Sequence, residues 1–176
     1  MKNLIALVGL TALMAVPSVH ADDADFSDVI NWKVGDSTTY TVTSSNNPTP
    51  GTMTKKVSKD DGDGTLWVNE TSTKESADIQ IRKSDGAVLQ RLVNGQPKPM
   101  QNAPLTLVSQ DKESVTVPAG TFNTLHTVSK GNQNGKAVQM DSWVDSQDTC
   151  MDGTVKSVMT SPDHTMTREL TGFHKN

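Results

Sequence analysis

The stretch Ala77-Asp78-Ile79-Gln80-Ile81-Arg82-Lys83 alternates apolar and polar side chains, and it is followed by Ser84-Asp85-Gly86 and a second apolar-rich run at residues 87–93. Alternation with a period of two puts successive side chains on opposite faces of a β-strand. Serine, aspartate and glycine are typical turn residues, and glycine accepts a positive φ without steric cost. This stretch therefore predicts a β-hairpin with one apolar face.

The same pattern, with many β-branched residues, recurs along the chain. It marks residues 37–45, 52–58, 65–73, 114–117, 121–130, 136–145, 154–160 and 165–173. Together with the first hairpin this predicts about nine or ten strands. Their connections are mostly short, so neighbours must be antiparallel, because a parallel pair needs a crossover of about a dozen residues. Breaks are expected at residues 46–51 and 96–104, and residues 22–31 contain the one candidate helix.

The composition limits how this sheet can be packed. Apolar residues make up 34% and aromatic residues 4% of the 176 residues, whereas globular proteins reach about 45–50% apolar on a count that includes glycine. So thin a core favours one curved antiparallel meander around a single apolar layer, as a half-barrel or a small closed barrel. We expect a mainly β fold with at most one or two short helices, in a single domain whose core spans about residues 32–173.

The first segment is expected to lie outside this domain. Lys2 supplies a positive charge, residues 4–16 are almost uninterruptedly apolar, and Val19 and Ala21 are small residues at cleavage-type positions. This pattern predicts a signal peptide over residues 1–21, cleaved after Ala21, and a mature domain of residues 22–176. The apolar run is shorter than the roughly 20 residues that span a bilayer, and no later run reaches that length. Asp22 follows the cleavage point, so a lipid-anchored product is not expected.

The charge argues against a nucleic-acid partner, and the cysteine content excludes an internal disulfide. The formal net charge is -4 and no basic cluster occurs, which argues against nucleic acid as a partner. Cys150 is the only cysteine, so no internal disulfide can form. No cation neighbours it in the sequence, and we expect a partly buried apolar side chain rather than a reactive thiol or an intermolecular bridge. The oligomeric state is left open.

One segment resembles a calcium-binding loop. In residues 59–70, Asp61, Asp63 and Glu70 occupy the third, fifth and twelfth places of an EF-hand pattern, with Gly64 at the sixth. Lys59, however, stands at the first place, where calcium needs a carboxylate. A hairpin turn is therefore the favoured interpretation, and Asp61, Asp63 and Glu70 are kept as a weak calcium candidate. No other metal and no cofactor is expected.

Motifs for catalysis are lacking. The histidines left after cleavage, among them His126 and His164, are far apart and show no metal-ligand spacing, and neither a GxSxG nor a GxGxxG motif occurs. Asp141, Trp143 and Asp145 share one strand face, an arrangement that suits sugar stacking but is more typical of a solvated face. Enzymatic activity is thus uncertain, and a non-enzyme is favoured.

Three stretches resemble uncharacterised bacterial periplasmic proteins of the domain-of-unknown-function kind, whose fold is similar to that of the lipoprotein-sorting chaperones (LolA- and LolB-like). They are Trp32-Lys33-Val34-Gly35-Asp36-Ser37-Thr38-Thr39-Tyr40, Val115-Thr116-Val117-Pro118-Ala119-Gly120-Thr121-Phe122, and Trp143-Val144 with Gly153-Thr154-Val155-Lys156. The resemblance implies a Gram-negative periplasm, and an unclosed barrel with a concave apolar surface that suits an acyl chain or another protein. The chain lacks the chaperones' set of covering helices, which argues against lipoprotein transport itself.

Three functions follow in order of preference. The first is a secreted periplasmic binding or interaction module for a lipid, a lipoprotein or an envelope protein, because a half-covered apolar face usually marks an interaction site. The second is a secreted hydrolase with His126 or His164 as base, and the third is an envelope structural or assembly protein. The ligand-binding candidates of the first are inward-facing residues on strands: Tyr40, Val42, Met53, Ile79, Ile81 and Met140.

Overall fold

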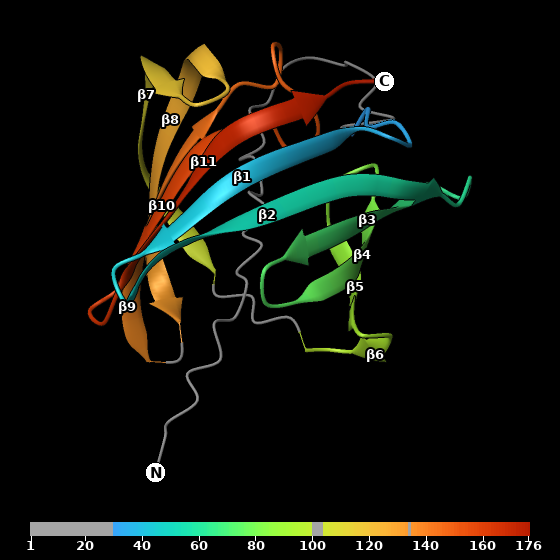
Figure 1. Ribbon diagram of the computed structural model, residues 1–176, viewed down its shortest axis with the longest axis horizontal. Helices are drawn as coiled ribbons and strands as arrows, with labels where there is room; N and C mark the ends of the chain where they lie inside the picture. The colour runs from blue at the N-terminus through green and yellow to red at the C-terminus, as the bar shows by residue number, and fades with distance from the viewer. Residues whose placement is uncertain (1–29, 100–103, 134) are drawn as a thin grey trace.

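The computed structural model describes residues 30–99, 104–133 and 135–176, and it is all β (Figure 1). The predicted signal peptide and almost all of the candidate helix lie outside the described residues. In chain order the strands are β1 (Ser37–Ser44), β2 (Asn47–Asp60), β3 (Thr65–Ser72), β4 (Ser76–Arg82), β5 (Val88–Val93), β6 (Gln96–Pro97), β7 (Leu105–Val117), β8 (Gly120–Gln133), β9 (Lys136–Val144), β10 (Thr154–Thr160) and β11 (Thr165–His174).

All eleven strands form one antiparallel sheet in the order β6-β5-β4-β3-β2-β1-β11-β10-β9-β8-β7. The chain thus makes two meanders, and the first strand joins them by pairing with the last, with Tyr40 opposite Leu170. β6 and β7 remain as the two edges, so the sheet is unclosed. The mainly β, curved antiparallel fold expected from the alternation is confirmed, and the half-barrel rather than the closed barrel is the form that this chain adopts.

Some boundaries differ from those expected. β2 begins at Asn47, although Pro48 and Pro50 mark a break in the sequence. These positions are solvent-exposed at the start of the strand, where a proline costs little. β7 begins at Leu105, and its polar middle is exposed on both faces. An edge strand needs no apolar face, so the alternation of apolar and polar residues does not reveal the first part of β7. Among the described residues there is no helix.

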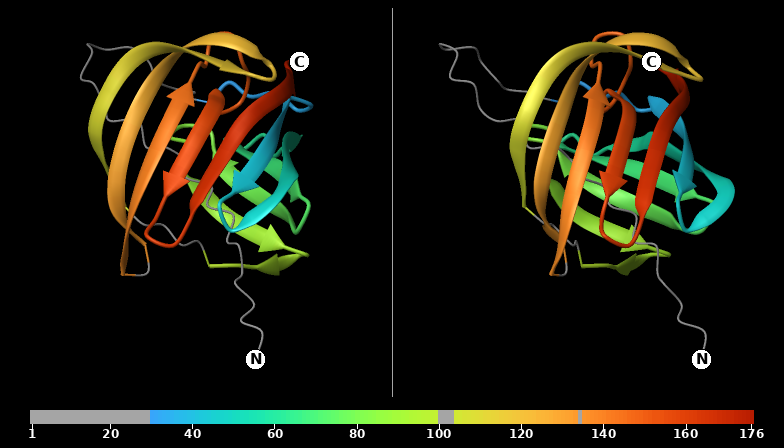
Figure 2. Two further views of the ribbon diagram at one scale, coloured as in Figure 1. Left: turned by 60° about the vertical axis from the view of Figure 1, so that its left-hand side comes forward. Right: turned by 90° about the vertical axis from the view of Figure 1, so that its left-hand side faces the viewer.

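The sheet curls strongly, and the hairpin of β7 and β8 arches over one end of it (Figure 2). The tip of this hairpin meets the last strand, where the Ala119 backbone N–H donates to the Leu170 carbonyl over 3.0 Å. Val117 and Phe122, on either side of the tip, pack against Tyr40 and Leu170. The curl therefore brings one edge of the sheet back onto its centre at this end.

Burial follows the predicted alternation. In β4, Ala77, Ile79 and Ile81 are buried while the residues between them are not, and β10 and β11 repeat this pattern. We call the side that carries these buried residues the inner face. The apolar inner-face residues form three clusters rather than one continuous core.

Candidate binding face

The first cluster covers the inner face of β2, β3 and β4. It contains Val57, Leu66, Val68, Ile79 and Ile81 from the strands, together with Ile30, Cys150 and Met151. Cys150 and Met151 belong to the loop between β9 and β10, and Trp32 packs against the same cluster. This half of the inner face is thus covered by the chain's own loops.

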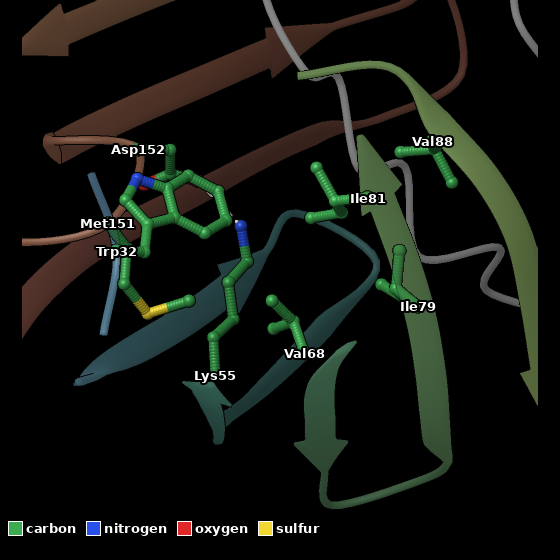
Figure 3. A pocket seen from close by; sticks show the side chains of 8 residues that line it. All are labelled: Trp32, Lys55, Val68, Ile79, Ile81, Val88, Met151 and Asp152. Carbon is green, nitrogen blue, oxygen red and sulfur yellow. Dashed lines mark hydrogen bonds and ion pairs between the residues drawn. The ribbon is translucent and has the colours of Figure 1, made fainter. Parts of the chain in front are cut away.

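The hollow beneath Trp32 is almost filled. Figure 3 shows Trp32, Lys55 and Met151 around it, with Ile79 and Val88 on the far side. The space is about 10 Å³, which is no more than a single water requires. Without rearrangement, this hollow has no room for a ligand larger than water.

An ion pair lies at the margin of this hollow. The Lys55 ammonium is 2.8 Å from the Asp152 carboxylate, and their side chains are 8% and 20% exposed. Burial by itself raises the pKa of Asp152, but the charge and hydrogen bond of Lys55 and the Thr154 backbone N–H outweigh it and lower the pKa to about 2. Asp152 is therefore ionised at neutral pH and ties the β9–β10 loop to β2.

The second cluster lies at the centre of the sheet, around Tyr40. Met53, Val117, Phe122, Val155 and Leu170 surround it. The hydroxyl of Tyr40 donates to the Thr154 carbonyl over 3.1 Å. Burial, followed by the nearby Asp152 charge, raises the pKa of Tyr40 well above its usual range. Tyr40 is therefore a protonated packing residue that also holds the start of β10.

The third cluster is a row of methionines. Met140, Met159 and Met166 are paired side by side across β9, β10 and β11, and all three are buried, with Val42 and Leu105 packed beside them. No residue of the β9–β10 loop belongs to this cluster. The methionine row is thus an apolar strip outside the self-covered half of the inner face.

A polar row runs beside the methionines. Thr127, Ser142, Ser157 and Arg168 are paired in turn across β8, β9, β10 and β11, and all four are buried. Nε of Arg168 donates to Oγ of Ser157 over 3.0 Å. Sequence reasoning missed this row, although the spacing Met166, Arg168, Leu170 already placed the arginine on the inward side of β11.

The six residues predicted to bind a ligand all lie on the inner face, but not at one place. Ile79 and Ile81 belong to the first cluster and Tyr40 and Met53 to the second. Met140 belongs to the third, and Val42 packs against both the second and the third. Of the six, only Met140 and Val42 adjoin the methionine row.

The carboxylates of the calcium candidate do not converge. Asp61 and Asp63 lie in the β2–β3 turn, where Asp61 pairs with Lys59 over 2.6 Å and accepts a hydrogen bond from the Trp67 indole. Glu70 lies on the inner face beside Arg91. Within the described ranges, no three His, Cys, Asp or Glu side chains are grouped as a metal site.

The candidate base His126 faces outward and stacks on Trp143, with ring centroids 4.2 Å apart. Its Nε2 is 3.3 Å from Asp141 and its Nδ1 is 3.7 Å from Glu113. Both ring nitrogens thus face carboxylates, and among the described residues neither contacts a nucleophilic hydroxyl.

The other candidate base, His164, hydrogen-bonds with the Ser161 hydroxyl over 3.0 Å inside the β10–β11 turn, which is a local turn contact. Asp145 is buried and accepts backbone N–H groups of the β9–β10 loop.

Cys150 is buried within the first cluster, and its Sγ lies 3.3 Å from the Ser37 carbonyl oxygen and 3.4 Å from that of His174, so its one S–H can donate to either. Burial, with the Asp36 charge second, raises its pKa to about 11. These contacts are those of a packed thiol rather than a reactive one.

Comparisons with known proteins found a similar solved structure, and neither a protein family nor a curated relative. No protein-family model matches the chain, and no curated protein matches it in sequence. A solved structure described as a "putative lipoprotein", from Parabacteroides distasonis, is similar at 10% identity with a TM-score of 0.43, over 84% of this chain and 98% of that one. In the part of the chain that the structure describes, no helix is long and apolar enough to span a membrane.

Proposed function

We propose that the mature chain, residues 22–176, is a periplasmic binding module that holds an apolar chain, such as a lipid acyl group, along the inner face of β9, β10 and β11. The methionine row carries this proposal, because among the described residues it is the apolar cluster of the inner face to which neither the β9–β10 loop nor the tip of the β7–β8 hairpin contributes. Methionine suits such a site, since its flexible, polarisable side chain adapts to irregular apolar partners.

Two further observations support the proposal. The inner face of β2, β3 and β4 is already filled by Trp32 and the β9–β10 loop, so a ligand is directed to the other half of the sheet. The strip is also continuous across three strands, because Met140 pairs with Met159 and Met159 with Met166. Such a strip suits an elongated ligand better than a compact one.

The test is uptake of an apolar fluorescent probe by the purified mature chain, together with mass spectrometry of lipids that purify with it. Met159→Thr places a hydroxyl in the middle of the strip and should weaken probe binding about tenfold. Val68→Thr makes a matched polar change in the self-covered cluster and should leave probe affinity within about twofold. Absence of both probe uptake and bound lipid would reject the proposal.

The cellular part of the proposal rests on residues 1–21. The positive start, the apolar run and the small residues at Val19 and Ala21 support export and cleavage after Ala21. Expression of the full chain in a Gram-negative host should yield a periplasmic product whose mass corresponds to a start at Asp22. A cytoplasmic product of full length would contradict this part.

A further inference from the structure

Arg168 is a buried cation that forms no ion pair with a carboxylate of the described residues. It is 8% exposed and lies on the inner face of β11 between Met166 and Leu170. Its one hydrogen bond to a described residue runs from Nε to Ser157, and none of the ion pairs among the described residues includes it. A guanidinium has five N–H donors, so the four on its two Nη atoms have no partner there.

Neighbouring charges do not neutralise it. Asp152 is close enough for Arg168 to help lower its pKa, but its carboxylate pairs with Lys55. Glu70 lies near Arg91 on β5. Among the described residues, the buried side-chain polar atoms that have no hydrogen-bond partner are Oε2 of Glu70 and Nε of Arg91. The Nη atoms of Arg168 are not among them, so they remain accessible from outside, and no carboxylate of a described residue forms an ion pair with them.

The residues beside Arg168 suit an anion. Ser157 accepts the Nε hydrogen bond, which leaves its own hydroxyl hydrogen available for donation. Ser142 is opposite Ser157 on β9, and Thr127 is opposite Ser142 on β8. The Thr127 hydroxyl donates to the Ser142 carbonyl, so the guanidinium fork and the hydroxyls of Ser157 and Ser142 form the line of donors. Carboxylate and phosphate groups are the ligands that such a fork binds in bidentate fashion.

The donor line adjoins the methionine row. Arg168 and Met166 are two residues apart on the inner side of β11, as Ser157 and Met159 are on β10 and Ser142 and Met140 are on β9. An anionic group at Arg168 would thus have an apolar strip directly beside it. A ligand with an anionic head and an apolar chain matches both rows at once.

We propose that Arg168, with Ser157 and Ser142, binds the carboxylate or phosphate head of an anionic amphiphile whose chain lies along Met140, Met159 and Met166. This inference rests on the proposed function, because it assigns a head-group site to the same inner face. It adds a charge preference that apolar binding alone does not require.

The experiment compares amphiphiles that share one chain length, by calorimetry with the mature protein at neutral pH and below their micelle concentrations. The probes are dodecanoate, dodecyl phosphate, neutral monolauroyl glycerol and cationic dodecyltrimethylammonium, with inorganic phosphate as a head group without a chain. We expect one or both anionic amphiphiles to bind at least about tenfold more tightly than the neutral and cationic ones. Which anion binds better distinguishes a carboxylate from a phosphate source.

Variants locate the preference. In Arg168→Gln, the affinities for the anionic and the neutral amphiphiles should differ by no more than about twofold, while the affinity for monolauroyl glycerol stays unchanged. Arg82→Gln, which removes an arginine from the exposed β4–β5 turn, should leave it intact. If Arg168→Gln does not fold, the double variant Ser142→Ala, Ser157→Ala keeps the cation and should lower anionic affinity at least about threefold.

Equal affinities across the four amphiphiles in the wild type overturn the inference and leave apolar binding intact. An equal loss of preference in Arg82→Gln also overturns the inference. Inorganic phosphate binding as tightly as dodecyl phosphate overturns it too, and counts against the apolar strip as well, because the chain would then add nothing to the affinity. If none of the four amphiphiles binds, the proposed function itself fails.

Discussion

Replacing Lys55 with methionine tests whether the buried ion pair with Asp152 holds the β9–β10 loop in place. The change keeps most of the side-chain volume but removes the ammonium that lies 2.8 Å from the carboxylate. Removing one partner of a buried pair leaves an uncompensated charge, which typically costs about 3–5 kcal/mol of unfolding free energy. That is a large part of the roughly 5–15 kcal/mol available to a single domain.

The pH dependence gives a second, independent measure. The pKa of Asp152 is lowered from 3.8 to about 2 in the folded chain, so the unfolded state binds its proton more tightly. The resulting stabilisation, about 2 kcal/mol, is present above the unfolded pKa and is lost as pH falls toward 2. In Lys55→Met, only the Thr154 backbone N–H and the Arg168 charge still oppose the effect of burial. The pKa of Asp152 should therefore rise above its wild-type value, and stability lost at pH 7 should be partly regained at pH 4.

Urea unfolding at both pH values measures these effects, and fluorescence reports them because Trp32 packs beside Lys55. Lys136→Met is the matched control, since Lys136 pairs with Asp163 at an exposed site, where an ion pair contributes about 0–1 kcal/mol. A loss below about 1 kcal/mol in Lys55→Met, with the wild-type pH profile retained, would refute the reasoning.

Three further predictions, two on substitutions and one on a chemical treatment, follow from the packing of buried side chains. Leu66→Ala opens a cavity at a fully buried position of the first cluster and should cost about 2–5 kcal/mol in urea unfolding. Tyr40→Phe removes the hydrogen bond to the Thr154 carbonyl and should cost about 0.5–1.5 kcal/mol by the same measurement; a neutral result would show that this bond is not needed. With its pKa near 11, Cys150 should react with a disulfide reagent at pH 8 about 200-fold more slowly than a free thiol of pKa 8.5, and denaturant should remove this difference.

Local patterns predicted the strands, because a half-buried strand shows its buried face as a period of two. Residues 154–160 match β10, and residues 77–83 match β4 to within one residue. Only the end of the edge strand β7, residues 114–117, was predicted, since its exposed middle from Ser109 to Ser114 has no apolar face. The short strand β6 (Gln96–Pro97) lies where a break was expected, and it follows a turn in which Asn94 and Gly95 both have positive φ.

The candidate site could be predicted only in part from the sequence. Alternation placed Tyr40, Ile79 and Met140 on the inner face, as the structure has them, but it could not show that they belong to three separate clusters. Which inner residues meet depends on pairings across strands far apart in the chain. The polar row that ends at Arg168 was missed, because a single inward-facing polar residue does not indicate a row until its neighbours on the other strands are known.

The sequence by itself determined most of the strands, the antiparallel order of neighbours in the chain, and the inward side of strands such as β4, β10 and β11, because all of these depend on residues a few positions apart. Only the tertiary structure decided that β1 pairs with β11 and that Trp32 and the β9–β10 loop fill one half of the inner face. It also decided that Arg168 stands beside three methionines on the other half. β1 and β11 are more than a hundred positions apart in the chain, and the other contacts join residues of different strands and loops, so no local pattern can specify them.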